Sequence, residues 1–292
     1  MRGLRDVLND PLLLDGAMGT QLFGLGLEGD CPEVWNVDKP DAVEGIHRGY
    51  IEAGAQIVLT NTFGATEWKL ALSGHAADVE RFCQAAAENA LRAAGGDGIY
   101  VLGDVGPTGE LPAPYGTHSV EEFEAAFAAQ TAALAGAGVH GIIVETMGSA
   151  VEAAAAVRAA KNTCDLPVLA CATYSAGKAG YRTLMGETVA QATEALLEAG
   201  ADVVGSNCGL GTEEMAEVVK EVKAVARGPI IAEPNAGQPK LVEGRTVFDE
   251  DAETWAARIP EIAAAGANIV GGCCGTTPEH IARAGRLLTG RA

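Results

Sequence analysis

Eight short apolar runs, separated by helical patterns, predict an α/β protein built as a single (β/α)8 TIM barrel. Each run is a continuous apolar stretch, which is typical of parallel strands covered on both faces. A doubly wound open sheet is the competing fold, but eight βα units in 292 residues favour a closed barrel. No shift in composition divides the chain, so we expect one domain over residues 1–292. The runs are Leu12–Asp15, Ile57–Asn61, Ile99–Asp104, Gly141–Glu145, Val168–Ala172, Asp202–Cys208, Pro229–Glu233 and Asn268–Cys273.

Helix boundaries between the runs are marked by capping residues and glycines. Ser119-Val-Glu-Glu122 and Ser149-Ala-Val-Glu152 have the form of capping boxes, in which a hydroxyl and a carboxylate bind reciprocal backbone N–H groups. Four Ala-Gly pairs each precede a run, where a left-handed glycine ends the preceding helix; these glycines are Gly54, Gly138, Gly200 and Gly266. Two stretches have apolar residues at spacings of three and four: Val79, Phe82, Cys83, Ala86 and Ala90 in the first, and Met215, Val218, Val219, Val222 and Val225 in the second.

Composition restricts the partners and the location of the protein. The net charge of −19 argues against nucleic acid, because proteins that bind phosphate backbones neutralise them with clustered lysine and arginine. No segment reaches the roughly 18 to 20 apolar residues of a membrane span. The N-terminus lacks the apolar core of a signal peptide, so we expect a cytoplasmic protein without a membrane partner.

Residues that follow the predicted strands are the candidates for chemistry, because (β/α)8 barrels place their active sites at the C-terminal strand ends. These positions hold Asp15, Thr60-Asn61, Asp104, Glu145, Thr173, Asn207-Cys208, Glu233-Pro-Asn235 and Cys273-Cys274.

Three of the seven cysteines lie at these strand ends: Cys208, Cys273 and Cys274. Three thiolates occupy three corners of a Zn²⁺ tetrahedron and leave the fourth open, as in a catalytic zinc site. The many glycines around them allow backbone to approach a ligand closely, and the helix expected from Pro278 favours ionised thiols. We expect His280 to have a packing role rather than to bind the metal. The other cysteines, expected to be structural, are Cys31, Cys83, Cys164 and Cys171.

An open zinc–trithiolate centre indicates the alkylation of a thiol. Its net negative charge makes it a poor catalyst of water attack, but it binds an incoming thiol and lowers the pKa of that thiol. Asp15 and Glu145 suit an ammonium clamp beside such a centre. Two other roles stay open for this pair: the acid and base of a glycosidase, and helix N-capping.

The whole chain resembles the homocysteine S-methyltransferase family, and most closely the homocysteine-binding domain of cobalamin-dependent methionine synthase. Betaine–homocysteine methyltransferase is a more distant relative. The sequence departs from the methionine synthase pattern at Gly209, where alanine is usual. The motifs that carry the resemblance are Asp15-Gly-Ala-Met-Gly-Thr20, Thr60-Asn-Thr-Phe-Gly64, Gly106-Pro-Thr108, Glu145-Thr146, Asn207-Cys-Gly, Pro234-Asn-Ala-Gly237 and Gly271-Gly-Cys-Cys-Gly-Thr-Thr-Pro-Glu-His280.

The resemblance implies a zinc-dependent methyltransferase that converts homocysteine to methionine. Cys208, Cys273 and Cys274 match the zinc ligands of the family, and these cysteines are also the expected catalytic residues. Asp15 and Glu145 match the acids that hold the homocysteine amino group. Asn235 matches an asparagine that occupies the fourth zinc position until the substrate displaces it. The expected substrate-binding set also includes Asn61, and Gly16, Ala17 and Met18, whose backbone faces the substrate carboxylate.

The methyl donor stays open between a methylcorrinoid or methylfolate and a sulfonium or betaine-type compound. Methylcobalamin supplied by a separate corrinoid protein is one option, and three long loops are expected to form the donor-facing rim: Val105–His118, Tyr174–Gly186 and Pro234–Val247. Two alternative functions are a methyltransferase for another thiol and a non-catalytic zinc-barrel subunit of a corrinoid methyltransfer complex.

Three further patterns are interpreted as non-functional or secondary. Gly24-Leu-Gly-Leu-Glu-Gly29 has the spacing of a dinucleotide-binding motif but lacks the strand–turn–helix context. Lys178 and Arg182 are solvated loop charges or contacts for an anionic donor. His47 and His75 are expected to be ordinary helix or loop residues.

Overall fold

The computed structural model describes residues 2–96, 98–242 and 245–289, and it confirms the predicted barrel. Eight parallel strands follow the order β1–β12–β9–β8–β5–β4–β3–β2, and a bridge between Leu14 and Ile57 joins the two ends of the sheet. Each strand lies within or overlaps one predicted run. The strands are β1 Leu12–Leu13, β2 Ile57–Leu59, β3 Tyr100–Val105, β4 Gly141–Met147, β5 Val168–Ala172, β8 Val203–Asn207, β9 Ile230–Glu233 and β12 Ile269–Val270.

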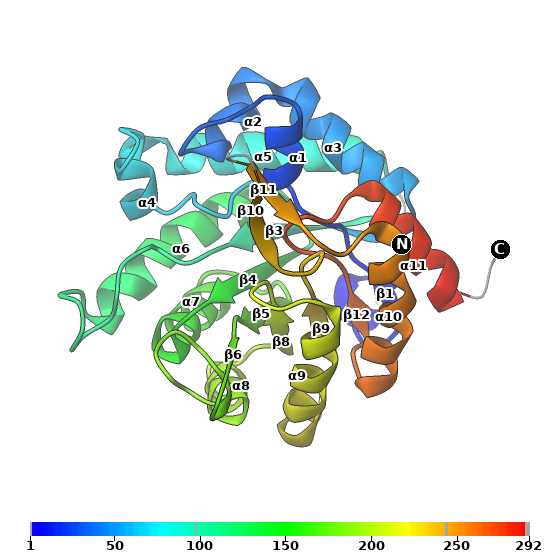
Figure 1. The fold of residues 1–292 in the computed structure, drawn as a ribbon. Coiled ribbons are helices and arrows are strands. Elements are labelled where there is room, and N and C mark those ends of the chain that lie inside the picture. Colours follow the sequence, from blue (N-terminus) through cyan, green and yellow to red (C-terminus); the bar gives the residue numbers. More distant parts are fainter. Residues whose placement is uncertain (1, 97, 243–244, 290–292) are drawn as a thin grey trace.

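Helices surround the strands as a ring (Figure 1). The predicted apolar helix faces are buried against the barrel in α5 and α9. None of the helices in the described ranges is long and apolar enough to cross a membrane. The α-helices are α1 Gly19–Gly24, α2 Trp35–Asp38, α3 Pro40–Glu52, α4 Glu67–Ala71, α5 Val79–Ala94, α6 Val120–Gly136, α7 Ala150–Thr163, α8 Val189–Glu198, α9 Thr212–Val225, α10 Ala252–Ala265 and α11 Pro278–Thr289; the 3-10 helices are η1 Leu4–Asp6, η2 Pro32–Val34 and η3 Ala76–Asp78.

Of the two predicted capping boxes, one is confirmed and the other is wrong. Ser119 and Glu122 exchange both reciprocal hydrogen bonds at the start of α6. Ser149 caps α7, but the Glu152 carboxylate does not return to it, because Glu152 Oε1 accepts from both the backbone N–H and the hydroxyl of Thr108 at 2.8 Å. The four helix-ending glycines all have left-handed φ angles, between 90° and 127°.

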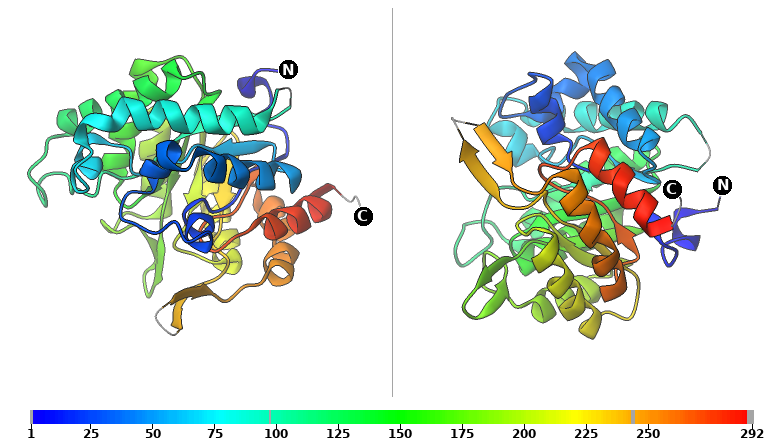
Figure 2. Two further views of the ribbon diagram at one scale, coloured as in Figure 1. Left: turned by 90° about the horizontal axis from the view of Figure 1, so that it is seen from above. Right: turned by 45° about the vertical axis from the view of Figure 1, so that its right-hand side comes forward.

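Two of the three predicted rim loops contain β-hairpins that the sequence patterns did not reveal. β6 Ser175–Gly177 pairs with β7 Gly180–Arg182, and β10 Pro239–Val242 pairs with β11 Arg245–Phe248. The β10–β11 hairpin projects away from the barrel at the end where the site lies (Figure 2). Residues 243–244 of the third predicted loop lie outside the described residues.

Side chains alternate along each strand between two cores. One core, inside the barrel, includes Leu102 of β3, Ile143 of β4 and Ile231 of β9. The other lies between the strands and the helices. The next inward position on each of these three strands, two residues further along, is an acid: Asp104, Glu145 and Glu233. Because side chains alternate with a period of two, these acids form a polar layer inside the barrel, at the C-terminal ends of the strands.

A glycine in β8 permits close strand packing, and we expect Gly205→Ala to lower the free energy of unfolding by at least about 3 kcal/mol. A Cβ atom at Gly205 would lie 1.8 Å from the Ile231 carbonyl oxygen of β9. Urea denaturation measures the effect. The matched control is Gly45→Ala in α3, where an added Cβ atom would have no neighbour within 4 Å. This substitution should stabilise the helix by about 0.5–1 kcal/mol. Equal stability of the two variants would contradict the packing argument.

His47 lies fully buried in α3, and neither ring nitrogen has a hydrogen-bond partner. Burial lowers the pKa of His47 to about 4. The unfolded chain therefore binds more protons between pH 6.5 and 4, so stability is lost as the pH falls through this range. We expect the free energy of unfolding of His47→Leu, relative to wild type, to be about 2 kcal/mol higher at pH 5 than at pH 8. Urea denaturation at the two pH values measures this difference. An equal gain at both pH values would disprove the linkage.

Candidate active site

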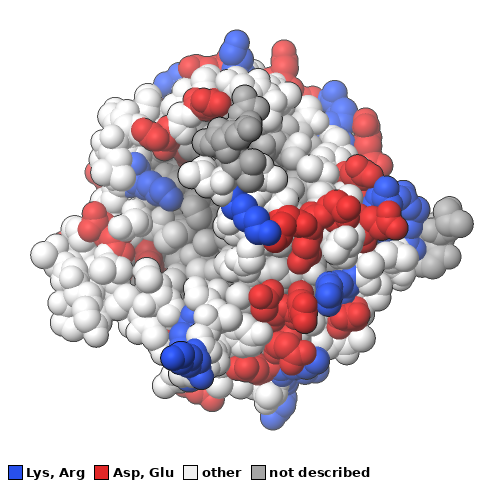
Figure 3. All heavy atoms as spheres, viewed as in Figure 1, with Lys and Arg blue, Asp and Glu red and all other residues white. Residues whose placement is uncertain are grey.

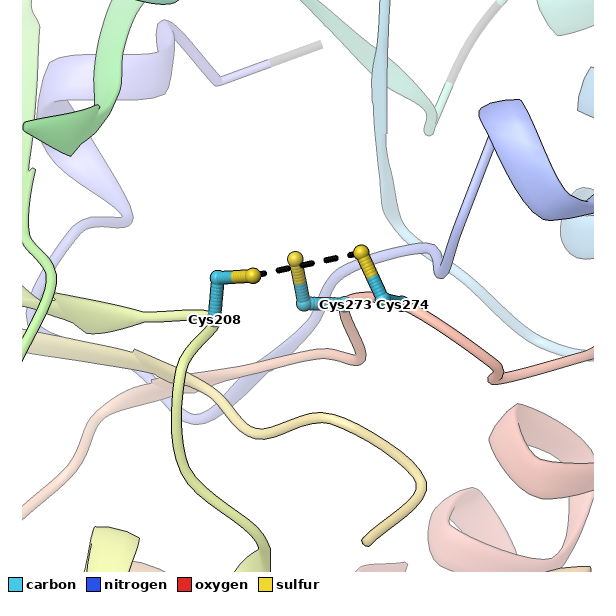
Figure 4. Close-up of side chains that lie close together, drawn as sticks. All are labelled: Cys208, Cys273 and Cys274. Carbon is cyan, nitrogen blue, oxygen red and sulfur yellow. Dashed lines mark hydrogen bonds between the residues drawn. The ribbon is translucent and has the colours of Figure 1, made fainter. Parts of the chain in front are cut away.

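The three strand-end cysteines converge at the mouth of the barrel. Cys208 follows β8, and Cys273 and Cys274 follow β12; β9 lies between these two strands. Their Sγ atoms all lie within 4.8 Å of one another, and the Cys208 and Cys274 sulfurs are 3.9 Å apart. Figure 4 shows all three side chains directed into the same space.

This arrangement fits a zinc ion. Zn–S bonds of about 2.3 Å in a tetrahedron place the sulfurs about 3.8 Å apart. Backbone hydrogen bonds to β9 and the segment after it hold the cysteines in place: Cys208 N–H donates to the Glu233 carbonyl and Cys273 N–H to the Pro234 carbonyl. Oδ1 of Asn235 is buried without a hydrogen-bond partner, and the Asn235 side chain is one of the groups that lower the pKa of the Cys208 thiol. An amide oxygen near a cysteine cluster suits the predicted fourth position.

Backbone strain is concentrated at this site. Among the described residues, only Thr146 and Cys208 have positive φ without being glycine, at 59° and 57°. A β-branched residue in this region costs free energy, and such strain tends to cluster at functional sites. Gly209 follows at φ 69°, and a Cβ atom there would lie 2.6 Å from the Tyr174 carbonyl oxygen. The glycine that departs from the methionine synthase pattern is therefore required by the local backbone.

Asn207 joins the cysteines to the acids, a role that the sequence interpretation missed. Its Oδ1 accepts from Thr146 N–H at 2.7 Å. Its Nδ2 donates to Glu145 Oε2 at 2.9 Å and to the Thr146 hydroxyl at 2.8 Å, and lies 3.9 Å from Cys273 Sγ. The signal available in the sequence was its inward position at the end of β8, directly before Cys208.

The three thiols share one negative charge among themselves. Hydrogen bonds from Cys273 and Cys274 lower the pKa of Cys208 to about 3, whereas the pKa of Cys274 rises to about 12 and that of Cys273 also rises. Like charges less than 5 Å apart repel, so a single thiolate stabilised by two thiol donors is favoured. The expectation that the N-terminus of α11 favours ionised Cys273 and Cys274 concerns the metal-bound cluster and stays a prediction.

Neither of the two predicted acids is a helix cap, which removes that alternative. Asp15 Oδ2 accepts from Leu59 N–H of β2 at 2.9 Å, across the seam that closes the barrel, and Glu145 binds Asn207. Burial raises the pKa of Asp15 well above its usual range and that of Glu145 to about 8. Within residues 2–96, 98–242 and 245–289, no salt bridge to either carboxyl is found.

Some of the remaining predicted substrate-binding residues already form hydrogen bonds within the protein, and others do not. Asn61 is buried, and its Nδ2 donates to Pro32 O and Asn36 Oδ1. Ala17 N–H donates to Thr276 Oγ1, and the Ala17 carbonyl accepts from Tyr50. No hydrogen bond is found for the N–H groups of Gly16 and Met18 within the part of the chain that the structure describes, so both are available to a ligand.

A cavity of about 400 Å³ connects these groups, and it is lined by the three cysteines and Asp15, Asp104, Glu145 and Glu233 among others. The segment between β1 and α3 forms part of its wall. This segment includes Cys31, for which the sequence predicts a structural role. Lys69 is the one lysine or arginine among the described lining residues, and its Nζ lies 4.6 Å from the centre of the Phe63 ring.

The secondary candidates lie outside the site. His280 contacts Thr277 through Nδ1 and the Glu250 carbonyl through Nε2, as expected of a packing residue. Lys178 and Arg182 belong to the β6–β7 segment and do not line the cavity. The Gly24–Gly29 run follows α1 rather than a strand, so it lacks the dinucleotide-binding context.

Fold and site together define a class: a (β/α)8 barrel with a cluster of three cysteines and buried carboxylates at its C-terminal mouth. The chain belongs to the homocysteine S-methyltransferase family, whose model matches residues 12–288.

Three relatives illustrate the match. Methionine synthases of Mycobacterium tuberculosis and Mycobacterium leprae are 36% and 34% identical over 95% and 91% of this chain. The chain spans only about a quarter of the length of these curated relatives, 25% and 23%. The metallated homocysteine methyltransferase MmuM of Escherichia coli superimposes with a TM-score of 0.79 at 26% identity, covering 96% of this chain and 98% of MmuM.

Proposed function

We propose that this barrel, expected over residues 1–292, is a zinc-dependent methyltransferase that moves a methyl group to the thiol of homocysteine and yields methionine. The observation that carries the proposal is the convergence of three cysteine sulfurs beside a cavity with buried, unpaired carboxylates. The family membership and the likeness to MmuM support homocysteine as the acceptor.

Each part of the cavity has a task in this reaction. Cys208, Cys273 and Cys274 would hold Zn²⁺, which when bound lowers the pKa of an incoming thiol and keeps it as a nucleophilic thiolate. Asp15 and Glu145 would bind the ammonium group by charge-assisted hydrogen bonds. The N–H groups of Gly16 and Met18 would meet the carboxylate. The substrate sulfur then forms a bond to the methyl carbon, while the donor leaves with the electron pair of the broken bond.

The donor is proposed to arrive at the rim formed by the three predicted loops. Each of these loops exposes an apolar side chain: Tyr115, Leu184 and Leu241 are 73%, 80% and 79% exposed. A corrinoid protein that carries methylcobalamin is one proposed donor, and these exposed apolar side chains are proposed contacts for it. On the face shown in Figure 3, basic side chains are scattered and acidic ones gather over α9 and α10, which offers no surface to a polyanion.

The test is to reconstitute the protein with zinc, add homocysteine, and follow sulfur ligation by X-ray absorption. We expect about one zinc per chain, a fourth sulfur on addition of homocysteine, and methionine formation with one donor class. Methylcobalamin, methylfolate, S-methylmethionine and betaine are supplied singly. Unchanged ligation would favour the non-catalytic subunit, and ligation of other thiols in preference to homocysteine would favour another acceptor.

A further inference from the structure

Two buried carboxylate oxygens in the cavity have no hydrogen-bond donor: Oδ1 of Asp15 and Oδ1 of Asp104. The two residues are only 3% and 6% exposed. Asp15 uses its other oxygen on Leu59 N–H, whereas no hydrogen bond is found for either carboxylate oxygen of Asp104 in the described ranges. Buried polar groups in folded proteins are nearly always paired, so these oxygens point to a donor that arrives with a ligand.

Asp104 belongs to the same wall as Glu145. Asp104 on β3 pairs in register with Ile143 on β4, and Glu145 lies two residues further along β4, about 7 Å up the strand. Both side chains occupy inward positions. Burial is the main cause that raises the pKa of Asp104, and Glu145 is the next, which agrees with close approach of the two carboxyls.

The cavity supplies no cation of its own to this wall. Lys69 lies over the Phe63 ring, and no salt bridge to Lys69 is found between the residues that the structure describes. The acids are also too widely spaced to be a metal cage, because within the described ranges only the three cysteines bring their ligand atoms within 4.8 Å of one another. Unpaired carboxylate oxygens accept hydrogen bonds, so a cation with several N–H donors, such as an ammonium group, suits them.

We propose that Asp104 is a third carboxylate of the substrate ammonium site and completes, with Asp15 and Glu145, a set of three acceptors that selects an α-amino thiol. This inference rests on the proposed function. An ammonium group has three N–H donors. Oδ1 of Asp15 and Oδ1 of Asp104 are free, and Glu145 has one oxygen left after Asn207 takes the other. Asp104 thus determines specificity for the amino group, and plays no part in holding the thiol.

The test compares two thiols that differ only in the amino group. Zinc-loaded wild type and Asp104→Asn are titrated by calorimetry with homocysteine and with 4-mercaptobutanoate, which keeps the thiol and the carboxylate. We expect Asp104→Asn to weaken homocysteine binding by roughly 10- to 100-fold, the effect of losing one hydrogen bond to a charged group. The affinity for 4-mercaptobutanoate should change by less than about twofold, the ordinary scatter at a position that the ligand does not touch.

The matched control is Glu152→Gln, which removes a buried carboxylate bound to Thr108 and outside the cavity lining. It should leave both affinities unchanged. An equal loss for both thiols in Asp104→Asn, or no loss for either, would overturn the inference while leaving the proposed function intact. Wild type that binds neither thiol would overturn both.

Thermal unfolding gives a second readout. Asp104→Asn should leave the Tm of the ligand-free protein at neutral pH unchanged or slightly higher, because burial already raises the pKa of the Asp104 carboxyl and the amide replaces an unpaired buried group of the same size. A lower Tm would show that the carboxylate is paired within the chain, which contradicts its role as a free acceptor.

Discussion

Replacement of Cys273 by serine is expected to abolish zinc retention and to reduce methyl transfer at least about 1,000-fold. Serine is a poor zinc ligand because its hydroxyl is not ionised at neutral pH, so two thiolates remain where three are needed. Cys273 is half-buried at the mouth and belongs to neither apolar core, so the barrel should stay folded. Metal analysis and circular dichroism on the same sample separate the two effects.

The control for this variant is Cys164→Ser. Cys164 Sγ contacts the Ala160 carbonyl at the end of α7, far from the cluster, and a serine hydroxyl can donate the same bond. It should keep its zinc and its activity. If Cys273→Ser binds one zinc per chain and turns over normally, the three-thiolate site is refuted.

Asn207→Ala is expected to lower kcat/KM for homocysteine by about 100-fold while zinc stays bound, an effect typical of residues that orient metal ligands and their neighbours. The variant removes the donor to Glu145 Oε2 and the acceptor of Thr146 N–H at once. Glu145 is then free to turn away from the substrate, and Thr146 loses the bond that holds its left-handed backbone. Steady-state kinetics with parallel metal analysis measures the loss.

Asn207→Asp sharpens this test, because it keeps the acceptor for Thr146 but places a second carboxylate against Glu145. We expect it to be no more active than Asn207→Ala. Asn89→Ala is the control for loss of a buried amide, since Asn89 binds the Asn36 carbonyl within the helical shell. Zinc loss in Asn207→Ala would show that Asn207 supports the metal site itself rather than the acids.

Local sequence patterns predicted the strands because each strand is apolar on both faces and glycine ends the helix before it. The same patterns failed for the two hairpins. The strands of β6–β7 are three residues long and largely exposed, and those of β10–β11 are only four residues long, the shortest length at which an alternating pattern indicates a strand. They failed also for Glu152, which has the spacing of a capping box but a stronger pair of donors in Thr108, 44 positions away. Competition between partners is invisible when only local spacing is considered.

The sequence alone predicted the barrel, the clustering of the three cysteines, and the acids at the strand ends. These features depend on the period of two along each strand and on the common direction of parallel strands, both of which are encoded locally. Only the tertiary structure decided which polar atoms are already paired and which are free. The Asn207 side chain, at the end of β8, hydrogen-bonds Glu145 of β4, and one oxygen of Asp15 accepts a hydrogen bond from Leu59 of β2. Oδ1 of Asp104 has no hydrogen-bond partner among the described residues. A hydrogen bond needs two groups within about 3 Å, and strand order and register, not sequence spacing, determine which groups meet.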